Sequence, residues 1–191
     1  MGESYPQSRS ELNNEHNIRV KDECGPIAFQ PRRLSRTAEE EVKKELRELE
    51  KMGVISTSNI PWASPIVCAR RQDGSLRLAI DYRALNRNSL PATLHPIPRM
   101  DNLMDRLTGA KYFAILDAKC GYHQMPLNRE ETETTACVVP WGQFEFCDRT
   151  PFGLKGAGYI FQRFMSDILG AINFVDAICF YPCSAQFCKN N

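Results

Sequence analysis

The sequence predicts an α+β domain, because segments with strand-like and helix-like hydrophobic patterns follow one another in mixed order. A run with helical spacing over residues 37–53 precedes two apolar runs that are joined by Asp73-Gly74. An Asp-Gly pair between apolar runs is typical of a β-hairpin. Further helical and strand-like segments alternate up to residue 180. We therefore expect a mixed or antiparallel sheet with helices packed on it.

Composition indicates a soluble, folded chain with one main core. The 191 residues are 42% hydrophobic and 25% charged, which argues against disorder. The net charge of +1 excludes a uniformly basic surface but allows a local basic face. No apolar run reaches membrane-spanning length and the N-terminus lacks a signal-peptide core, so we expect an intracellular protein and no membrane partner. The eight cysteines form no Cys-x-x-Cys pair, which argues against structural zinc.

The first helix is expected to follow a polar N-terminal linker. Residues 1–30 show no clear period and are predicted to become extended over 18–29. Thr-Ala-Glu-Glu, beginning at Thr37, matches the capping-box pattern and predicts the start of the helix. Gly53 is predicted to end this helix as its C-terminal cap.

The second half of the chain contains five further predicted elements. A helix is expected over residues 97–108, and an apolar strand over 112–116. Alternating residues over 138–146, interrupted by Pro-Trp-Gly, predict a hairpin. A third helix is expected over 154–169, and a last strand over 174–180.

One carboxylate stands out because of its position. Asp117 follows the apolar strand over 112–116, and Gly-Tyr-His-Gln occupies residues 121–124. A carboxylate at the end of a rigid strand is a suitable ligand for Mg²⁺, although an isolated aspartate there more often forms a cap or turn. Two other segments carry distinctive motifs. One is a predicted hairpin over 61–86, and the other is Thr-Pro-Phe-Gly-Leu-Lys, which opens the helical segment at 150–165.

Together these three phrases resemble reverse transcriptases, in the form used by gypsy-class LTR retrotransposons. The resemblance covers residues 16–180 and implies a right-hand polymerase fold, with fingers and a partial palm. It divides the chain into a linker (1–30), a fingers-like region (31–110), a partial palm (111–180) and a divergent tail (181–191). It also implies Mg²⁺, a primed RNA or DNA template and deoxynucleoside triphosphates as partners. The sequence does not indicate an oligomeric state.

The resemblance assigns roles to residues of the palm. It implies that Asp117 is a catalytic metal ligand and that Tyr122 closes the floor of the nucleotide pocket, where it would exclude a ribose 2′-hydroxyl. Phe152 would lie near the nucleotide sugar, and Gly153 would let the backbone approach closely. Taken alone, Tyr122 is interpreted as a half-buried packing residue.

The resemblance also assigns roles to charged residues of the fingers. Arg70 or Arg71, together with Arg77, would bind the triphosphate, a role that suits the bidentate guanidinium group. Asp81 and Arg83 are predicted to pair near the template strand. That pair has a purely structural interpretation of equal weight.

The remaining metal ligands of the family are missing from the sequence. A Tyr-x-Asp-Asp motif is expected after the last strand, but Pro182 and Cys183 occupy the aspartate positions, or Cys183 and Ser184 after a shift of one residue. Asp176 is the only acid nearby. We therefore expect a reverse transcriptase fragment that is truncated before this motif and catalytically inactive. The alternatives are a template–primer binding module without chemistry, or a repurposed interaction protein.

Overall fold

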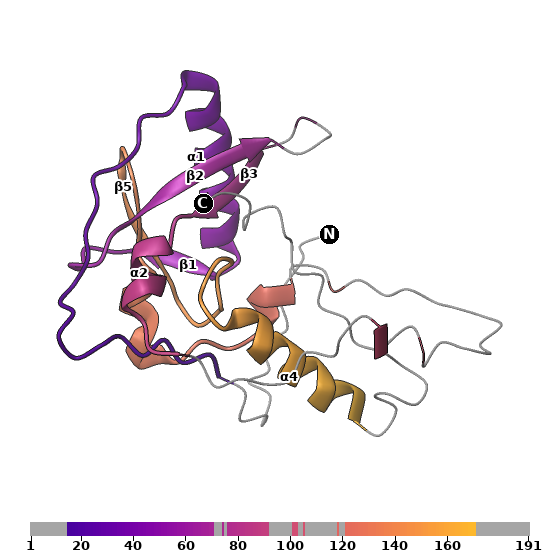
Figure 1. Cartoon of the computed structure of the whole chain (residues 1–191). Helices are drawn as coiled ribbons and strands as arrows, with labels where there is room; N and C mark the ends of the chain where they lie inside the picture. Colours follow the sequence, from indigo (N-terminus) through magenta and orange to yellow (C-terminus); the bar gives the residue numbers. More distant parts are fainter. Residues whose placement is uncertain are drawn as a thin grey trace.

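The strands form one five-stranded sheet, which lies beside the first helix (Figure 1). The computed structural model describes residues 15–70, 74, 76–91, 101–102, 105, 118 and 121–170. The order of the strands is β1-β5-β4-β2-β3. Their bounds are β1 Ile55–Thr57, β2 Ser64–Arg70, β3 Leu76–Ile80, β4 Cys137–Val139 and β5 Gly142–Phe146.

The sheet is mixed, as the sequence predicts. β2 and β3 form the expected hairpin, as do β4 and β5, and β1 pairs antiparallel with β5. β2 and β4 are parallel, with Ser64 opposite Cys137. These two strands lie far apart in the chain, which leaves the long connection that a parallel pair needs. Gly74, in the β2–β3 connection, has a φ of 81°, a left-handed conformation that glycine adopts without strain.

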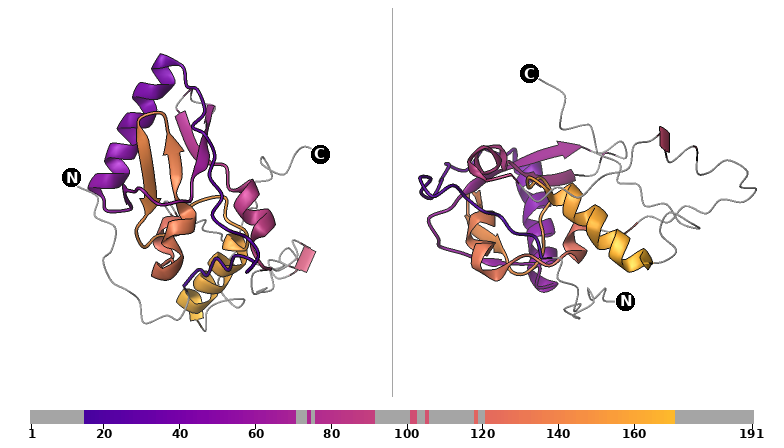
Figure 2. Two further views of the ribbon diagram at one scale, coloured as in Figure 1. Left: turned by 90° about the vertical axis from the view of Figure 1, so that its left-hand side faces the viewer. Right: turned by 60° about the horizontal axis from the view of Figure 1, so that its bottom comes forward.

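Helix α1 (Arg36–Lys51) lies along the sheet and contacts β1 and β3 (Figures 1 and 2). The prediction that Thr37 starts this helix is wrong. The cap is Ser35, which has an extended backbone and whose hydroxyl accepts a hydrogen bond from the Ala38 amide at 3.3 Å. Thr37 already has helical geometry, so its hydroxyl cannot serve the cap. The glycine-terminated end is confirmed, since Gly53 has a φ of 68° directly after Met52, the C-cap of the helix.

Helix α4 (Ala157–Leu169) begins later than the predicted residue 154. The reason is Gly156, whose φ of 84° is incompatible with a right-handed helix. The residues before it form a turn. α4 contacts the short 3₁₀ helix η1 (Gly121–Gln124), while α2 (Arg83–Asn88) follows β3 and η2 (Arg129–Thr135) precedes β4.

Residues 16–29 form an N-terminal strap that crosses several parts of the fold. The amide of His16 donates to the carbonyl of Pro126 at 2.9 Å, the amide of Leu90 to Arg19 at 2.7 Å, and the amide of Phe29 to Ala63 at 2.8 Å. His16 is fully buried and Ile18 belongs to the core. The extended course predicted over 18–29 is confirmed at the bridges formed by Val20 and Ala28.

Several predicted elements fall outside the described residues. These are the strands over 112–116 and 174–180, and most of the helix over 97–108, of which Asp101, Asn102 and Asp105 are described and helical. Within the described part of the chain, no helix combines the length and hydropathy needed to cross a membrane.

Candidate functional site

An aromatic cluster surrounds Tyr122. Its ring centroid lies 4.9 Å from that of Phe152 at a tilt of 42°, and 5.6 Å from that of Phe161 in an edge-on arrangement. Such offset and edge-to-face contacts stabilise aromatic pairs beyond the burial of their surface. Tyr122 is 6% exposed, whereas Phe152 is 43% exposed. The structure therefore brings two predicted site residues together, one ring buried and the other exposed.

Gly121 allows η1 to pack closely on α4. A Cβ atom at this position would lie 2.9 Å from Cε2 of Phe161 and 3.0 Å from its Cζ. Real Cβ contacts are longer than this, so a side chain here would push the Phe161 ring away. The glycine before Tyr122 thus holds the aromatic cluster together.

His123 lies buried between rings of the same cluster. Its ring centroid is 5.2 Å from that of Phe152 and 5.9 Å from that of Phe146. Burial and, to a smaller extent, the positive charge of Arg149 together lower the pKa of His123 to about 4. The imidazole is therefore neutral near pH 7 and fits a packing role.

The turn between Phe152 and Lys155 is fastened to α2 by a residue that sequence reasoning missed. Nδ2 of Asn86 donates to the carbonyl of Gly153 at 2.8 Å, and its Oδ1 accepts from the amide of Lys155 at 2.8 Å. Gly153 has a φ of 95°, and a Cβ there would meet the carbonyl of Ile80 at 3.5 Å. Asn86 lies in the segment 61–86 that resembles the family, but nothing in the sequence indicated its partners, because they lie almost 70 residues away.

Lys155 joins the same turn to two other segments. Its Nζ donates to the carbonyl of Ser89 at 3.1 Å. Its own carbonyl accepts from Nε2 of His16 at 3.3 Å. Burial lowers the pKa of His16 to about 4, so this imidazole is neutral as well. The turn, the end of α2 and the strap are thereby connected through one residue.

Two of the predicted triphosphate ligands, Arg70 and Arg77, lie on opposite faces of the hairpin. Arg70 forms a bidentate pair with Glu41 of α1, at 2.7 and 2.9 Å, and also donates to the carbonyl of Gly74 at 3.1 Å. In the β2–β3 register Arg77 lies opposite Ala69, one residue from Arg70. Neighbouring residues of a strand point to opposite faces, so Arg77 lies on the face away from α1. Arg71 lies outside the described residues.

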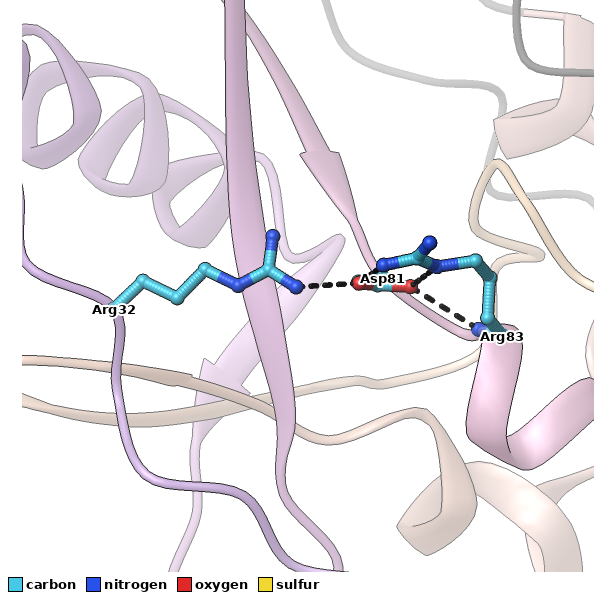
Figure 3. Close-up of polar contacts among 3 residues, drawn as sticks. All are labelled: Arg32, Asp81 and Arg83. Carbon is cyan, nitrogen blue, oxygen red and sulfur yellow. Dashed lines mark hydrogen bonds and ion pairs between the residues drawn. The ribbon is translucent and has the colours of Figure 1, made fainter. Parts of the chain in front are cut away.

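Asp81 and Arg83 form the predicted pair, and Arg32 joins it (Figure 3). The carboxylate of Asp81 accepts from Nε and Nη2 of Arg83, both at 2.7 Å, and from Nη2 of Arg32 at 2.5 Å. Hydrogen bonds from Arg83, and then from Arg32, lower the pKa of Asp81 strongly. The Asp81 side chain is 10% exposed but that of Arg83 is 79% exposed. The guanidinium of Arg83 therefore faces solvent while the carboxylate of Asp81 holds it in place. Arg32 comes from the segment before α1 and had no sequence signal.

The predicted metal ligand Asp117 lies outside the described residues. Among the residues that are described, no three histidine, cysteine or acidic side chains gather closely enough to hold a metal ion. The assignment of Asp117 to metal binding and catalysis therefore stays a prediction.

Comparison with known proteins identifies the family. The family model described as "Reverse transcriptase (RNA-dependent DNA polymerase)" matches residues 69–181, more than half of the chain. The chain is 36% identical over 163 residues to the Pol polyprotein from transposon 297 of Drosophila melanogaster, and 40% identical over 134 residues to that from transposon gypsy. These alignments cover 83% and 67% of the chain but only 14% and 13% of the relatives, so the chain spans about one seventh of their length.

Solved structures support the same conclusion about the fold. A prototype foamy virus protease–reverse transcriptase matches with a TM-score of 0.73 at 24% identity, over 83% of this chain and 21% of that one. A foamy viral protease–reverse transcriptase in complex with double-stranded DNA matches with a TM-score of 0.66 at 21% identity, over 81% and 26% of the two chains. The polymerase-type α+β fold predicted from the sequence is confirmed. The chain belongs to the reverse transcriptase family and is a reverse transcriptase domain of the retrotransposon Pol polyprotein type.

Proposed function

We propose that this chain binds a primed template and positions a deoxynucleoside triphosphate over Tyr122, as the fingers and palm of an RNA-directed DNA polymerase. The observation that carries the proposal is the contact of the exposed Phe152 ring, in the turn that contains Gly153, with the buried Tyr122 ring. An aromatic floor that cannot move aside excludes a bulkier sugar. This geometry supports selection of a deoxyribose over a ribose.

The nucleic acid would lie against the surface that carries Arg83. Its guanidinium is held by Asp81 at 2.7 Å and is largely exposed, which keeps a cation oriented toward solvent. Phosphate contacts from such guanidinium groups supply most of the sequence-independent affinity for nucleic acids. The foamy viral relative that was solved with double-stranded DNA supports this role.

Asp117 is proposed to hold Mg²⁺, which would supply electrostatic stabilisation of the charge that develops in phosphoryl transfer. A pair of metal ions needs more than one carboxylate. Asp176 is the only acidic residue in 170–191, and Pro182 and Cys183 stand where the family has aspartates. We therefore propose that the chain as it stands binds its template without extending the primer.

Binding is tested with a fluorescent primed RNA template, by anisotropy between 50 and 200 mM salt. We expect affinity to fall steeply with salt, and to fall further in Arg83→Gln. Arg47→Gln is the matched control, since Arg47 is an exposed arginine of α1. Binding that does not respond to salt, or equal losses in both variants, would contradict the proposed surface.

Chemistry is tested by primer extension with Mg²⁺ and all four deoxynucleotides. We expect no extension by the natural chain, and a gain in a variant that combines Pro182→Asp with Cys183→Asp. Adding Asp117→Asn should abolish that gain. Extension by the natural chain that Asp117→Asn removes would show that another acid completes the site.

A further inference from the structure

Asn86 links helix α2 to the turn 152–155, which lies almost 70 residues further along the chain. It lies in α2, directly after β3, and its amide donates to the carbonyl of Tyr82 at 2.8 Å within that helix. Its side chain reaches across to the turn that carries Phe152, with one donor and one acceptor each used at 2.8 Å. The side-chain amide of Asn86 therefore pairs with one backbone carbonyl and one backbone N–H of the turn, as a neighbouring strand would.

The turn needs an external partner because one of its residues, Gly153, and the residue that follows the turn, Gly156, have left-handed backbones. Gly153 and Gly156 have φ values of 95° and 84°, and the helix α4 begins only at Ala157. The carbonyl of Gly153 and the amide of Lys155 thus lie outside the helical hydrogen-bond ladder. Asn86 satisfies both, and no single backbone segment in the described part of the chain does so.

The base of Asn86 is itself rigid. Tyr82, one turn earlier, is fully buried, and its hydroxyl donates to the carbonyl of Thr135 at 2.7 Å. Leu85 is also buried, so α2 cannot shift easily. A fixed helix therefore sets the position of the turn, and the turn sets the backbone from which the Phe152 ring extends over Tyr122.

We propose that Asn86 is a positioning residue of the nucleotide site, which holds the turn 152–155 so that Phe152 stays on Tyr122. This inference rests on the proposed function, in that the turn is taken to face a nucleotide. Asn86 acts through the backbone of the turn and does not itself contact the reacting atoms. Loss of the side chain should loosen nucleotide binding and leave the affinity for the primed template unchanged.

The first measurement does not depend on function. Amide hydrogen exchange of Lys155 is followed by NMR in the natural chain, in Asn86→Ala, and in Asn88→Ala as the matched control from the same helix. The side chain of Asn88 donates to Ala84 within α2, at 2.9 Å, and does not reach the turn. We expect exchange at Lys155 to accelerate about tenfold in Asn86→Ala alone. Asn86→Asp keeps the acceptor for Lys155 and should accelerate it less.

The second measurement compares two affinities in the same variants. The apparent affinity for a deoxynucleoside triphosphate is measured as stabilisation of the complex with primed template in Mg²⁺, beside the affinity for the primed template alone. We expect Asn86→Ala to weaken the first by about three- to tenfold and to leave the second unchanged.

The outcomes separate the inference from the proposed function. Unchanged exchange in Asn86→Ala, equal effects in Asn88→Ala, or a joint fall of both affinities would overturn the positioning role. If the natural chain shows no nucleotide effect at all, the proposed function fails, and the exchange result alone decides whether Asn86 fixes the turn.

Discussion

The candidate residues near the β2–β3 hairpin differ from those of the aromatic cluster in their exposure to solvent. Arg70 at the end of β2 and Arg83 at the start of α2, just after the hairpin, are exposed and each pairs with a carboxylate. In the cluster, Tyr122 and His123 are buried among rings, with relative exposures of 6% and 8%. Exposed ion pairs contribute little to folding, whereas buried rings contribute strongly. Substitutions should therefore change the stability of the fold little at these arginines and strongly in the cluster.

The largest contrast is expected when one side chain is removed from each region. Tyr122→Ala should lower the free energy of unfolding by about 3–5 kcal/mol, because it leaves a cavity against Phe152 and Phe161. Arg77→Ala on the hairpin should lower it by about 1 kcal/mol or less. Urea unfolding followed by circular dichroism measures both. Losses of similar size would show that the hairpin is part of the cooperative core.

Acid should destabilise the fold in different pH ranges through the two buried histidines, His16 of the strap and His123 of the cluster, and through Asp81. Burial lowers the pKa values of His16 and His123 from 6.5 to about 4, so the unfolded chain takes up these protons first. Their neutral forms stabilise the fold at pH 7, and this contribution is lost as the pH falls from 6.5 to about 4. The loss is about 2–3 kcal/mol for each histidine.

Asp81, which directly follows β3, should respond only below that range. Its pKa is lowered from 3.8 by Arg83 and Arg32, so its contribution is present above pH 3.8 and is lost as the pH falls further. Urea unfolding at successive pH values checks the order of these losses. His123→Phe should remove roughly half of the dependence between pH 6.5 and 4. An unchanged profile in that variant would contradict the assignment to the cluster.

A smaller effect is expected from glycine substitutions. Gly121→Ala should cost about 1–3 kcal/mol, since the added methyl group meets the Phe161 ring at 2.9 Å. Gly25→Ala in the strap is the control, because no atom lies within 4 Å of the added Cβ. Thermal unfolding of both variants is sufficient to compare them. Equal melting temperatures would mean that α4 retreats from η1 without cost.

The smallest effect is expected at the Arg70–Glu41 pair. Arg70→Glu should lower the melting temperature slightly, and adding Glu41→Arg should restore it, since the pair is then reversed. The difference should vanish in 1 M salt, where the screening length is about 3 Å. A difference that persists in high salt would point to packing rather than charge.

Local sequence determined the elements that depend on neighbours in the chain. Asp73-Gly74 and the Pro-Trp-Gly stretch each placed a hairpin, because turn chemistry depends on a few adjacent residues. Gly53 placed the end of α1 for the same reason. The phrases around Tyr122 and Phe152 placed two site residues that do meet in space. The starts of α1 and α4 were misplaced, because each depended on the backbone angles of a single residue, Ser35 and Gly156.

Only the tertiary structure decided which distant groups meet. Asn86 pairs with Gly153 and Lys155, and Arg32 pairs with Asp81 across 49 residues. The separation of Arg70 and Arg77 onto two faces followed from a register that the length of the turn sets. Such contacts have no periodic or local signature, because they arise when packing of the core brings separate segments together. The sequence by itself therefore determined the family, the hairpins and the residue types of the site, while packing decided which of them converge.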